Sequence, residues 1–156
     1  RRQRQMCKET VGKLTYLGIA LKQLITARKV SCTLTLEDKV HDKKESVELP
    51  RFLFVTCMSH RYEGGGFMFC PPAVDHDGVL DLCSVGNISK GLVLLALPTA
   101  FFGKHYFVKG INAHTATQMS ITASAPLWVH TDGEVTRKSR GFRVECLPGA
   151  IRMITP

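Results

Sequence analysis

The 156-residue sequence lacks several patterns that would assign a function directly. Its six cysteines include no CxxC pair, and this spacing argues against a zinc site. It has no GxGxxG stretch and no Walker motif, so motifs alone assign no phosphate-binding loop. Repeats and low-complexity tracts are also absent. The most apolar run, "GLVLLALPTAFF" at 91–102, contains a proline and is too short to cross roughly 30 Å of hydrocarbon.

Acidic residues are scarce relative to basic ones: 13 Asp and Glu stand against 21 Lys and Arg, for a net charge of +8. Such an excess fits an anionic partner such as lipid headgroups, nucleotide phosphates or nucleic acid. Basic and aromatic residues are not interleaved, so we do not expect a nucleic-acid-binding surface. No signal peptide is visible and several cysteines lie in apolar alternation, which predicts reduced thiols in a cytoplasmic protein.

The first half of the sequence changes its hydrophobic period from helical to extended. Apolar residues recur at steps of three and four over 8–27, which predicts an amphipathic helix. "VSCTLTL" at 30–36 alternates apolar and polar residues, as a half-buried strand does. "EDKVHDKKES" at 37–46 is predicted to be a charged loop, and the apolar "RFLFVTCM" at 51–58 a buried strand.

The second half predicts more strands and one short helix. A turn at Asp77-Gly78 leads into a strand at 79–85, and "NISKGLVLLALP" at 87–98 begins with a polar residue that could cap a helix. Four further strands are predicted at "TATQMSITASA", "PLWVHT", "GFRVECLP" and "AIRMIT". One or two helices with seven or more strands predict a mainly β, sandwich-like single domain.

The stretch "HTDGEV" at 130–135 places two carboxylates around Gly133. Asp-Gly is a strong signal for a tight hairpin, so Asp132 and Gly133 could form nothing more than an exposed turn. Alternatively, the turn holds the carboxylate of Glu134 at the mouth of an active site. The stretch by itself leaves both interpretations open.

Three segments occur in an order that is typical of a known family: "GGGFMFCPPAVDHDGVLDL" at 64–82, "WVHTDGEV" at 128–135 and "RVECLPGAIRMI" at 143–154. This set resembles the C-terminal domain of the diacylglycerol-kinase-like lipid kinases, which include bacterial diacylglycerol kinases and sphingosine kinases. The resemblance implies the β-sandwich-like C-terminal domain of the diacylglycerol kinase/NAD kinase-like fold over 1–156. The chain departs from the family pattern at Ser59, where relatives often have asparagine.

The family's Gly-Gly-Asp-Gly-Thr phosphate loop does not occur in these 156 residues. We therefore expect the chain to be a C-terminal fragment whose nucleotide-binding domain lies upstream, and to be inactive alone. The implied partners are a lipid substrate, that N-terminal domain and a peripheral membrane surface at the inner face of the membrane, with no nucleic acid. A non-enzymatic β-sandwich that binds a lipid or another apolar ligand is the alternative, and a basic nucleic-acid-binding module is a third class.

The resemblance also assigns chemistry to particular residues. A lipid kinase transfers the γ-phosphoryl group of ATP to a lipid hydroxyl with the help of Mg²⁺, and needs a group that takes the hydroxyl proton. Glu134 is implied as that proton acceptor, or as a carboxylate that organises Mg²⁺, with Asp132 and Gly133 shaping its turn.

Two further sites are implied. Relatives hold a structural Mg²⁺ in the loop that corresponds to "VDHDGV", where Asp77 would bind through its side chain and Val74 and Val79 through backbone oxygens; a plain turn is the alternative. The apolar run could shelter acyl tails instead of forming ordinary core, through Val93, Leu94, Leu97 and Phe101. Diacylglycerol, a sphingoid base and an undecaprenol-like alcohol all fit as the lipid.

Overall fold

A single antiparallel sheet with one well-formed helix makes up the computed structural model, which describes residues 21–22, 24–63, 66–131 and 134–150. The elements are β1 (Val30–Asp38), β2 (Lys43–Met58), β3 (Leu80–Gly86), helix α2 (Lys90–Ala100), the 3-10 helix η2 (His105–Phe107), β4 (Ile111–Ala116), β5 (Gln118–Thr131) and β6 (Glu134–Glu145). The strand order is β4-β3-β2-β1-β5-β6.

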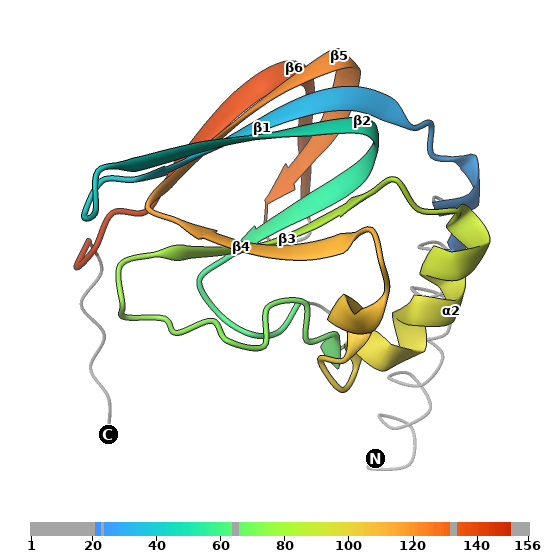
Figure 1. Cartoon of the computed structure of the whole chain (residues 1–156), viewed down its shortest axis with the longest axis horizontal. Helices are drawn as coiled ribbons and strands as arrows, with labels where there is room; N and C mark the ends of the chain where they lie inside the picture. The colour runs from blue at the N-terminus through green and yellow to red at the C-terminus, as the bar shows by residue number, and fades with distance from the viewer. Residues whose placement is uncertain (1–20, 23, 64–65, 132–133, 151–156) are drawn as a thin grey trace, which may run out of the picture.

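The sheet curls over itself into a sandwich-like body. Only Thr117 separates β4 from β5, although three strands stand between them in the sheet order. Figure 1 shows how this is possible, because β1, β2, β5 and β6 pass above β3 and β4. The space between the layers holds a buried cluster that includes Leu34 of β1, Leu82 of β3 and Met119 of β5. β1 thereby buries one face of its pleat, in agreement with the alternation of its sequence, whereas β3 is buried on both faces.

Helix α2 lies outside the sheet and packs on β3 and the loops beside it (Figure 1). The hydroxyl of Ser89 accepts a hydrogen bond from the backbone N–H of Leu92 at 3.2 Å, which caps the helix start. Val93, Ala96 and Ala100 are buried at steps of three and four, so this side of the helix faces the core. The turn after the helix requires Gly103, which has a positive φ and whose added Cβ would lie 2.7 Å from Pro71.

The structure confirms the predicted fold class and most of the predicted elements. The strands at 30–36, 51–58 and 79–85, the turn at Asp77-Gly78 and the helix that follows are present. Of the predicted helix at 8–27, residues 21–22 and 24–26 are helical, residue 27 is not, and the rest lies outside the described residues. The predicted strand "AIRMIT" lies almost wholly outside them as well.

Three strand predictions were wrong. Half of the predicted loop at 37–46 is strand, because Lys43–Ser46 pair with β1 across a loop of residues 39–42. The edge strand β4 was missed, because its alternation is weak where Asn112, Ala113 and Thr115 face solvent. The two predicted strands at 115–125 and 126–131 are one strand, β5, so the described part of the chain has six strands. Pro126 is accommodated there because the pairing with β6 is irregular between Thr122 and Leu127.

Candidate functional site

The hairpin of β5 and β6 presents the predicted catalytic carboxylate. The two strands are paired as far as Thr131 opposite Glu134, so Glu134 opens β6 next to the hairpin turn. Its side chain is exposed and forms no salt bridge with the described residues. The two residues of the turn itself, Asp132 and Gly133, lie outside the described residues. The geometry therefore leaves Glu134 accessible to a reacting group.

The stem of this hairpin is basic. Arg137 and Lys138 follow Glu134 on β6 and are exposed. The ammonium of Lys138 lies 4.4 Å from the ring centroid of Trp128, its partner on β5, which is a cation–π distance. The Thr136 hydroxyl donates a hydrogen bond to the carbonyl of Val129 at 2.9 Å and ties the strands together. Exposed cations along the hairpin that carries Glu134 suit a reaction in which anionic groups approach.

The loop predicted to hold Mg²⁺ is a tight turn around Asp77. One carboxylate oxygen of Asp77 accepts a hydrogen bond from the backbone N–H of Val79 at 3.0 Å, and Gly78 has a φ of +79°. The side chain of Asp77 is exposed, and its other oxygen accepts no hydrogen bond from the described part of the chain. Within that part, no three His, Cys, Asp or Glu side chains are grouped to hold a metal. A cation in this loop would therefore depend on backbone oxygens, such as those of Val74 and Val79.

A buried carboxylate, Asp81, lies four residues beyond Asp77. It is only 4% exposed and borders a cavity of about 130 Å³ between β3, β4 and the loop before β3. Burial raises the pKa of the Asp81 carboxyl, and the negative charge of Asp77 raises it further. His114 lines the same cavity and forms a hydrogen bond with the Ser84 hydroxyl at 2.9 Å. The pKa of the Asp81 carboxyl is therefore set mainly by its burial, with the charge of Asp77 as a smaller influence.

Four residues of the apolar run were predicted to shelter a lipid tail. In the structure, two of them line a cavity and two do not. Val93 and Leu97 line a narrow apolar cavity of about 20 Å³ between α2 and the sheet. That volume is roughly the space of one water molecule, so an acyl chain would fit only if α2 shifted. Leu94 is half-buried away from this cavity, and Phe101 stacks on Phe67 with 4.2 Å between ring centroids.

Aromatic and histidine side chains fix the segment that leads to the Asp77 loop. The carbonyl of Phe69 accepts hydrogen bonds from the Tyr106 hydroxyl at 2.6 Å and from Nε2 of His105 at 3.2 Å. Two buried thiols lie near, and burial raises the pKa of Cys70 to about 12 and that of Cys83 to about 11. Thiols with such values are inert at neutral pH. The five described cysteines are all unpaired, as predicted.

Comparison with known proteins identifies the family. The family described as "YegS C-terminal NAD kinase beta sandwich-like domain" matches residues 1–155. The chain belongs to this YegS C-terminal family.

Relatives of this YegS C-terminal domain carry the name "Probable lipid kinase YegS-like". The one from Xanthomonas campestris pv. campestris is 30% identical over 151 residues, which are 96% of this chain and 46% of that protein. The one from Xanthomonas euvesicatoria pv. vesicatoria is 35% identical over 98 residues, 62% of this chain and 31% of that protein. The chain therefore spans at most about half the length of these relatives.

Solved structures agree on the fold of the YegS C-terminal domain. A "putative diacylglycerol kinase" from Bacillus anthracis str. Sterne superposes with a TM-score of 0.58 at 22% identity, over 85% of this chain and 44% of that chain. At this identity the likeness establishes the fold alone.

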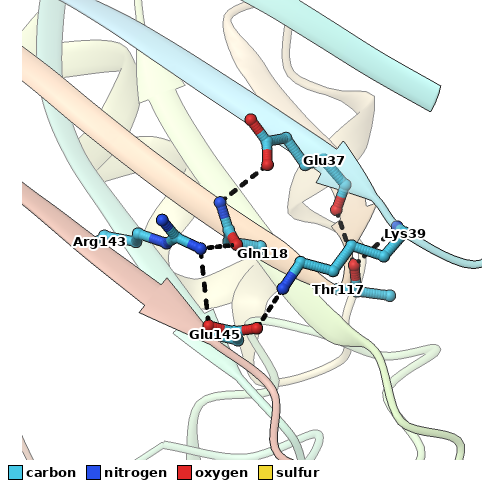
Figure 2. Close-up of polar contacts among 6 residues, drawn as sticks. All are labelled: Glu37, Lys39, Thr117, Gln118, Arg143 and Glu145. Carbon is cyan, nitrogen blue, oxygen red and sulfur yellow. Dashed lines mark hydrogen bonds and ion pairs between the residues drawn. The ribbon is translucent and has the colours of Figure 1, made fainter. Parts of the chain in front are cut away.

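The end of the sheet where β1 stops and β5 starts carries a polar network in this YegS C-terminal domain (Figure 2). Gln118 is buried, donates to the Glu37 carboxylate at 2.8 Å and accepts from the Arg143 guanidinium. Arg143 and Lys39 both contact the Glu145 carboxylate. These contacts tie the last residues of β6 to β1 and β5, whereas two irregularities in the β5–β6 pairing separate them from Glu134 at the start of the strand.

Sequence reasoning missed Asp81 and His114. The signal for Asp81 was present, since it is the single charged residue in the apolar strand at 79–85. A charged residue in a strand is usually at a solvent-facing position, which is why the pattern did not single it out. His114 lies on β4, the strand whose alternation was too weak to detect.

Proposed function

We propose that this domain supplies the acceptor side of an ATP-dependent lipid kinase, with Glu134 as the group that takes the proton from the lipid hydroxyl. The observation that carries the proposal is an accessible carboxylate at the turn of a hairpin whose stem is basic. Membership of the YegS C-terminal family supports it. Because the chain covers less than half of its YegS-like relatives, ATP is bound mainly by a nucleotide-binding domain outside these residues.

The chemistry asks two things of this domain. The lipid hydroxyl must lose its proton as the γ-phosphoryl group of ATP arrives, and a carboxylate held in place accepts that proton. Negative charge spreads over the phosphoryl oxygens during transfer, and fixed cations stabilise it. Glu134 meets the first need. Arg137 pairs with Val129, two residues from Thr131, the partner of Glu134, so it lies on the same face of the hairpin and meets the second. A carboxylate in this position can alternatively organise the catalytic Mg²⁺.

The Asp77 loop holds a structural Mg²⁺ in this proposal. Asp77 would bind through its carboxylate, and Val74 and Val79 through backbone oxygens. The exposed Asp77 carboxylate supports a cation here, because one of its oxygens accepts only the Val79 N–H within the turn and the other faces outward. When bound, the ion supplies positive charge and makes the loop more rigid.

The lipid is held along α2. Val93 and Leu97 already border an apolar cavity, and a shift of α2 would extend it past Leu94 and Phe101. The acceptor is therefore an alcohol with long apolar chains, and a diacylglycerol-like lipid is the class we propose.

The test is Glu134→Gln in the complete protein. Glutamine keeps the size and the hydrogen-bonding oxygen but cannot take a proton at neutral pH. Loss of a general base typically costs ~10²–10⁴-fold, so kcat for lipid phosphorylation should fall at least a hundredfold while lipid affinity changes little. Glu45→Gln removes an exposed strand carboxylate elsewhere and should leave kcat unchanged. A near-normal kcat for Glu134→Gln would show that "HTDGEV" is a turn without catalytic function.

A further inference from the structure

The outward side of α2 and the segment after it expose large apolar side chains. Phe107 is 89% exposed, Phe102 76% and Leu95 74%, and Leu92 and Phe101 are partly exposed. We call these five residues the α2 surface. Scattered single apolar residues on a surface need no explanation, but five within sixteen residues of chain do.

The exposed side of α2 contrasts with its packed side. Val93, Ala96 and Ala100 are buried against the core, whereas Leu92 and Leu95 point away from it. Apart from Lys90 the helix carries no charged residue. A helix that is apolar all round is normally buried in protein or lies against a membrane. Among the described helices none is long and apolar enough to cross a bilayer, so the expected membrane contact is with the surface.

The segment of sequence that carries the α2 surface has charges of one sign, and Glu63, which pairs with Phe67 beneath Phe101, is a carboxylate that approaches it from elsewhere in the chain. The sequence contains no Asp or Glu between Asp81 and Asp132. Lys104 and Lys109 flank η2, are exposed, and form no salt bridge within the described ranges. Exposed lysines beside exposed phenylalanines, with no neighbouring carboxylate in the sequence, complement a partner that is both apolar and anionic.

We propose that the α2 surface docks on an anionic phospholipid bilayer. Phe102, Phe107 and Leu95 enter the boundary between headgroups and acyl chains, and Lys104 and Lys109 contact lipid phosphates. This inference deepens the proposed function, since a lipid kinase must meet its acceptor at a membrane, but docking itself needs neither ATP nor Glu134. A second copy of the chain is a poorer partner, because a symmetric contact would bring two sets of lysines together without carboxylates between them.

The first test is sedimentation of the complete protein with vesicles, without ATP. Vesicles of phosphatidylcholine and phosphatidylglycerol in equal amounts should bind it, and phosphatidylcholine alone much less. Leu95→Ser with Phe107→Ser should weaken binding at least about tenfold, because each side chain loses its transfer to an apolar phase. Lys104→Gln with Lys109→Gln should weaken it roughly fivefold per lysine at low salt.

Matched variants control for surface polarity and net charge. Val40→Ser with Leu147→Ser changes two apolar side chains that are 75% and 69% exposed elsewhere, and should leave vesicle binding unchanged. Lys43→Gln with Arg140→Gln removes the same charge as the α2 lysine pair, and should weaken binding less than that pair does. All four double variants should keep the wild-type thermal midpoint, because the altered side chains are exposed.

A second test reports insertion directly. These 156 residues contain one tryptophan, Trp128, so Trp128→Phe with Phe107→Trp moves their single indole to the α2 surface, and Trp128→Phe alone gives the background emission of the complete protein. Its emission should shift to shorter wavelength with the anionic vesicles and be quenched by brominated acyl chains. An emission that does not respond to these vesicles would overturn the proposal.

The two proposals can fail separately. If the complete protein binds anionic vesicles through the α2 surface but phosphorylates no lipid, docking stands and the kinase proposal falls. If it phosphorylates detergent-dispersed lipid while the α2 variants bind vesicles as the wild type does, docking falls. Self-association that Leu95→Ser with Phe107→Ser abolishes, without any vesicle binding by the wild type, would assign the surface to a second copy and overturn the membrane proposal.

Discussion

The β5–β6 hairpin and the α2 surface expose side chains of opposite character. The hairpin exposes charge: Glu134 adjoins the turn, with Arg137 and Lys138 along the stem. The α2 surface exposes Phe102 and Phe107 in a stretch of sequence without a carboxylate. One region is suited to proton and phosphoryl chemistry, and the other to contact with lipid. If both proposals hold, the reactive carboxylate and the membrane contact of this domain lie on separate elements of one sheet-based core.

The largest effect is expected where the core that carries both regions is damaged. Leu34 is fully buried between the layers, so Leu34→Ala should lower the free energy of unfolding by about 2–5 kcal/mol. Leu95→Ala removes the same atoms from an exposed side chain, and should change the free energy of unfolding by no more than about 0.5 kcal/mol. Urea unfolding of the two variants measures the difference. Equal losses would mean that the α2 surface is buried inside the folded protein.

The next effect separates the two regions by function. Glu134→Asp keeps the charge but shortens the side chain by one methylene, so its kcat on detergent-dispersed lipid should lie between those of Glu134→Gln and the wild type. Vesicle binding should be unchanged in both variants, because Glu134 is not part of the α2 surface. A loss of vesicle binding in Glu134→Asp would show that the hairpin also contacts the membrane, and the separation of roles would then be wrong.

The same two regions show what the sequence could and could not predict. The strict alternation of 30–36 predicted β1 because one face of that strand is buried, and Asp77-Gly78 predicted its turn because glycine permits a positive φ. The exposure of Phe102 and Phe107 could not be predicted, because an apolar run is normally core. Likewise, a strand that continues past Pro126 depends on an irregularity in its pairing, which only the folded sheet reveals.

The candidate site was predicted unevenly for a related reason. Glu134 and Asp77 were predicted as site residues because ordered motifs carry them, and the structure places both at turns where their carboxylates are exposed. The electrostatic interaction between Asp77 and Asp81 was not predicted, because it depends on the burial of Asp81 against β4 and η2. Distances between segments far apart in the chain are set by packing, which no single motif encodes.

A smaller effect is expected when Mg²⁺ is added to test the Asp77 loop. If Asp77 binds Mg²⁺, added Mg²⁺ should raise the thermal midpoint of the wild type, because an ion bound only to the folded state stabilises it. For a chain of this size about 1 kcal/mol corresponds to roughly 2–4 °C. Asp77→Ala should abolish the response, whereas Asp75→Ala, which removes an exposed partner of His76, should retain it. A response that survives in Asp77→Ala would leave the loop as a plain turn.

The smallest expected effect is the dependence of stability on pH, which should differ between the α2 side of the molecule and the β1–β5 ladder. Burial lowers the pKa of His105 at the start of η2 and that of His114 in the cavity on β4, so folding favours the neutral form of both imidazoles. Between these lowered values and the unfolded pKa of about 6.5, the unfolded chain binds protons that the folded chain does not. The stabilisation is therefore complete above about pH 6.5 and is lost as the pH falls below it. The thermal midpoint, followed from about pH 7.5 to about pH 5, should decline.

Hydrogen exchange under the same conditions locates that loss. Amides of α2 and η2 should exchange faster as the pH falls, after correction for the intrinsic rate, while the β1–β5 ladder stays protected, because His105 packs against the α2 side of the sheet. His114→Gln keeps a hydrogen-bonding group for Ser84 but cannot titrate, so it should flatten the pH dependence of the thermal midpoint. His60→Gln alters an exposed histidine and should keep the wild-type slope. If the thermal midpoints of both variants depend on pH with the same slope, His114 does not carry the acid sensitivity. If amides of α2 and of the β1–β5 ladder exchange at the same rate, the two regions unfold as one unit.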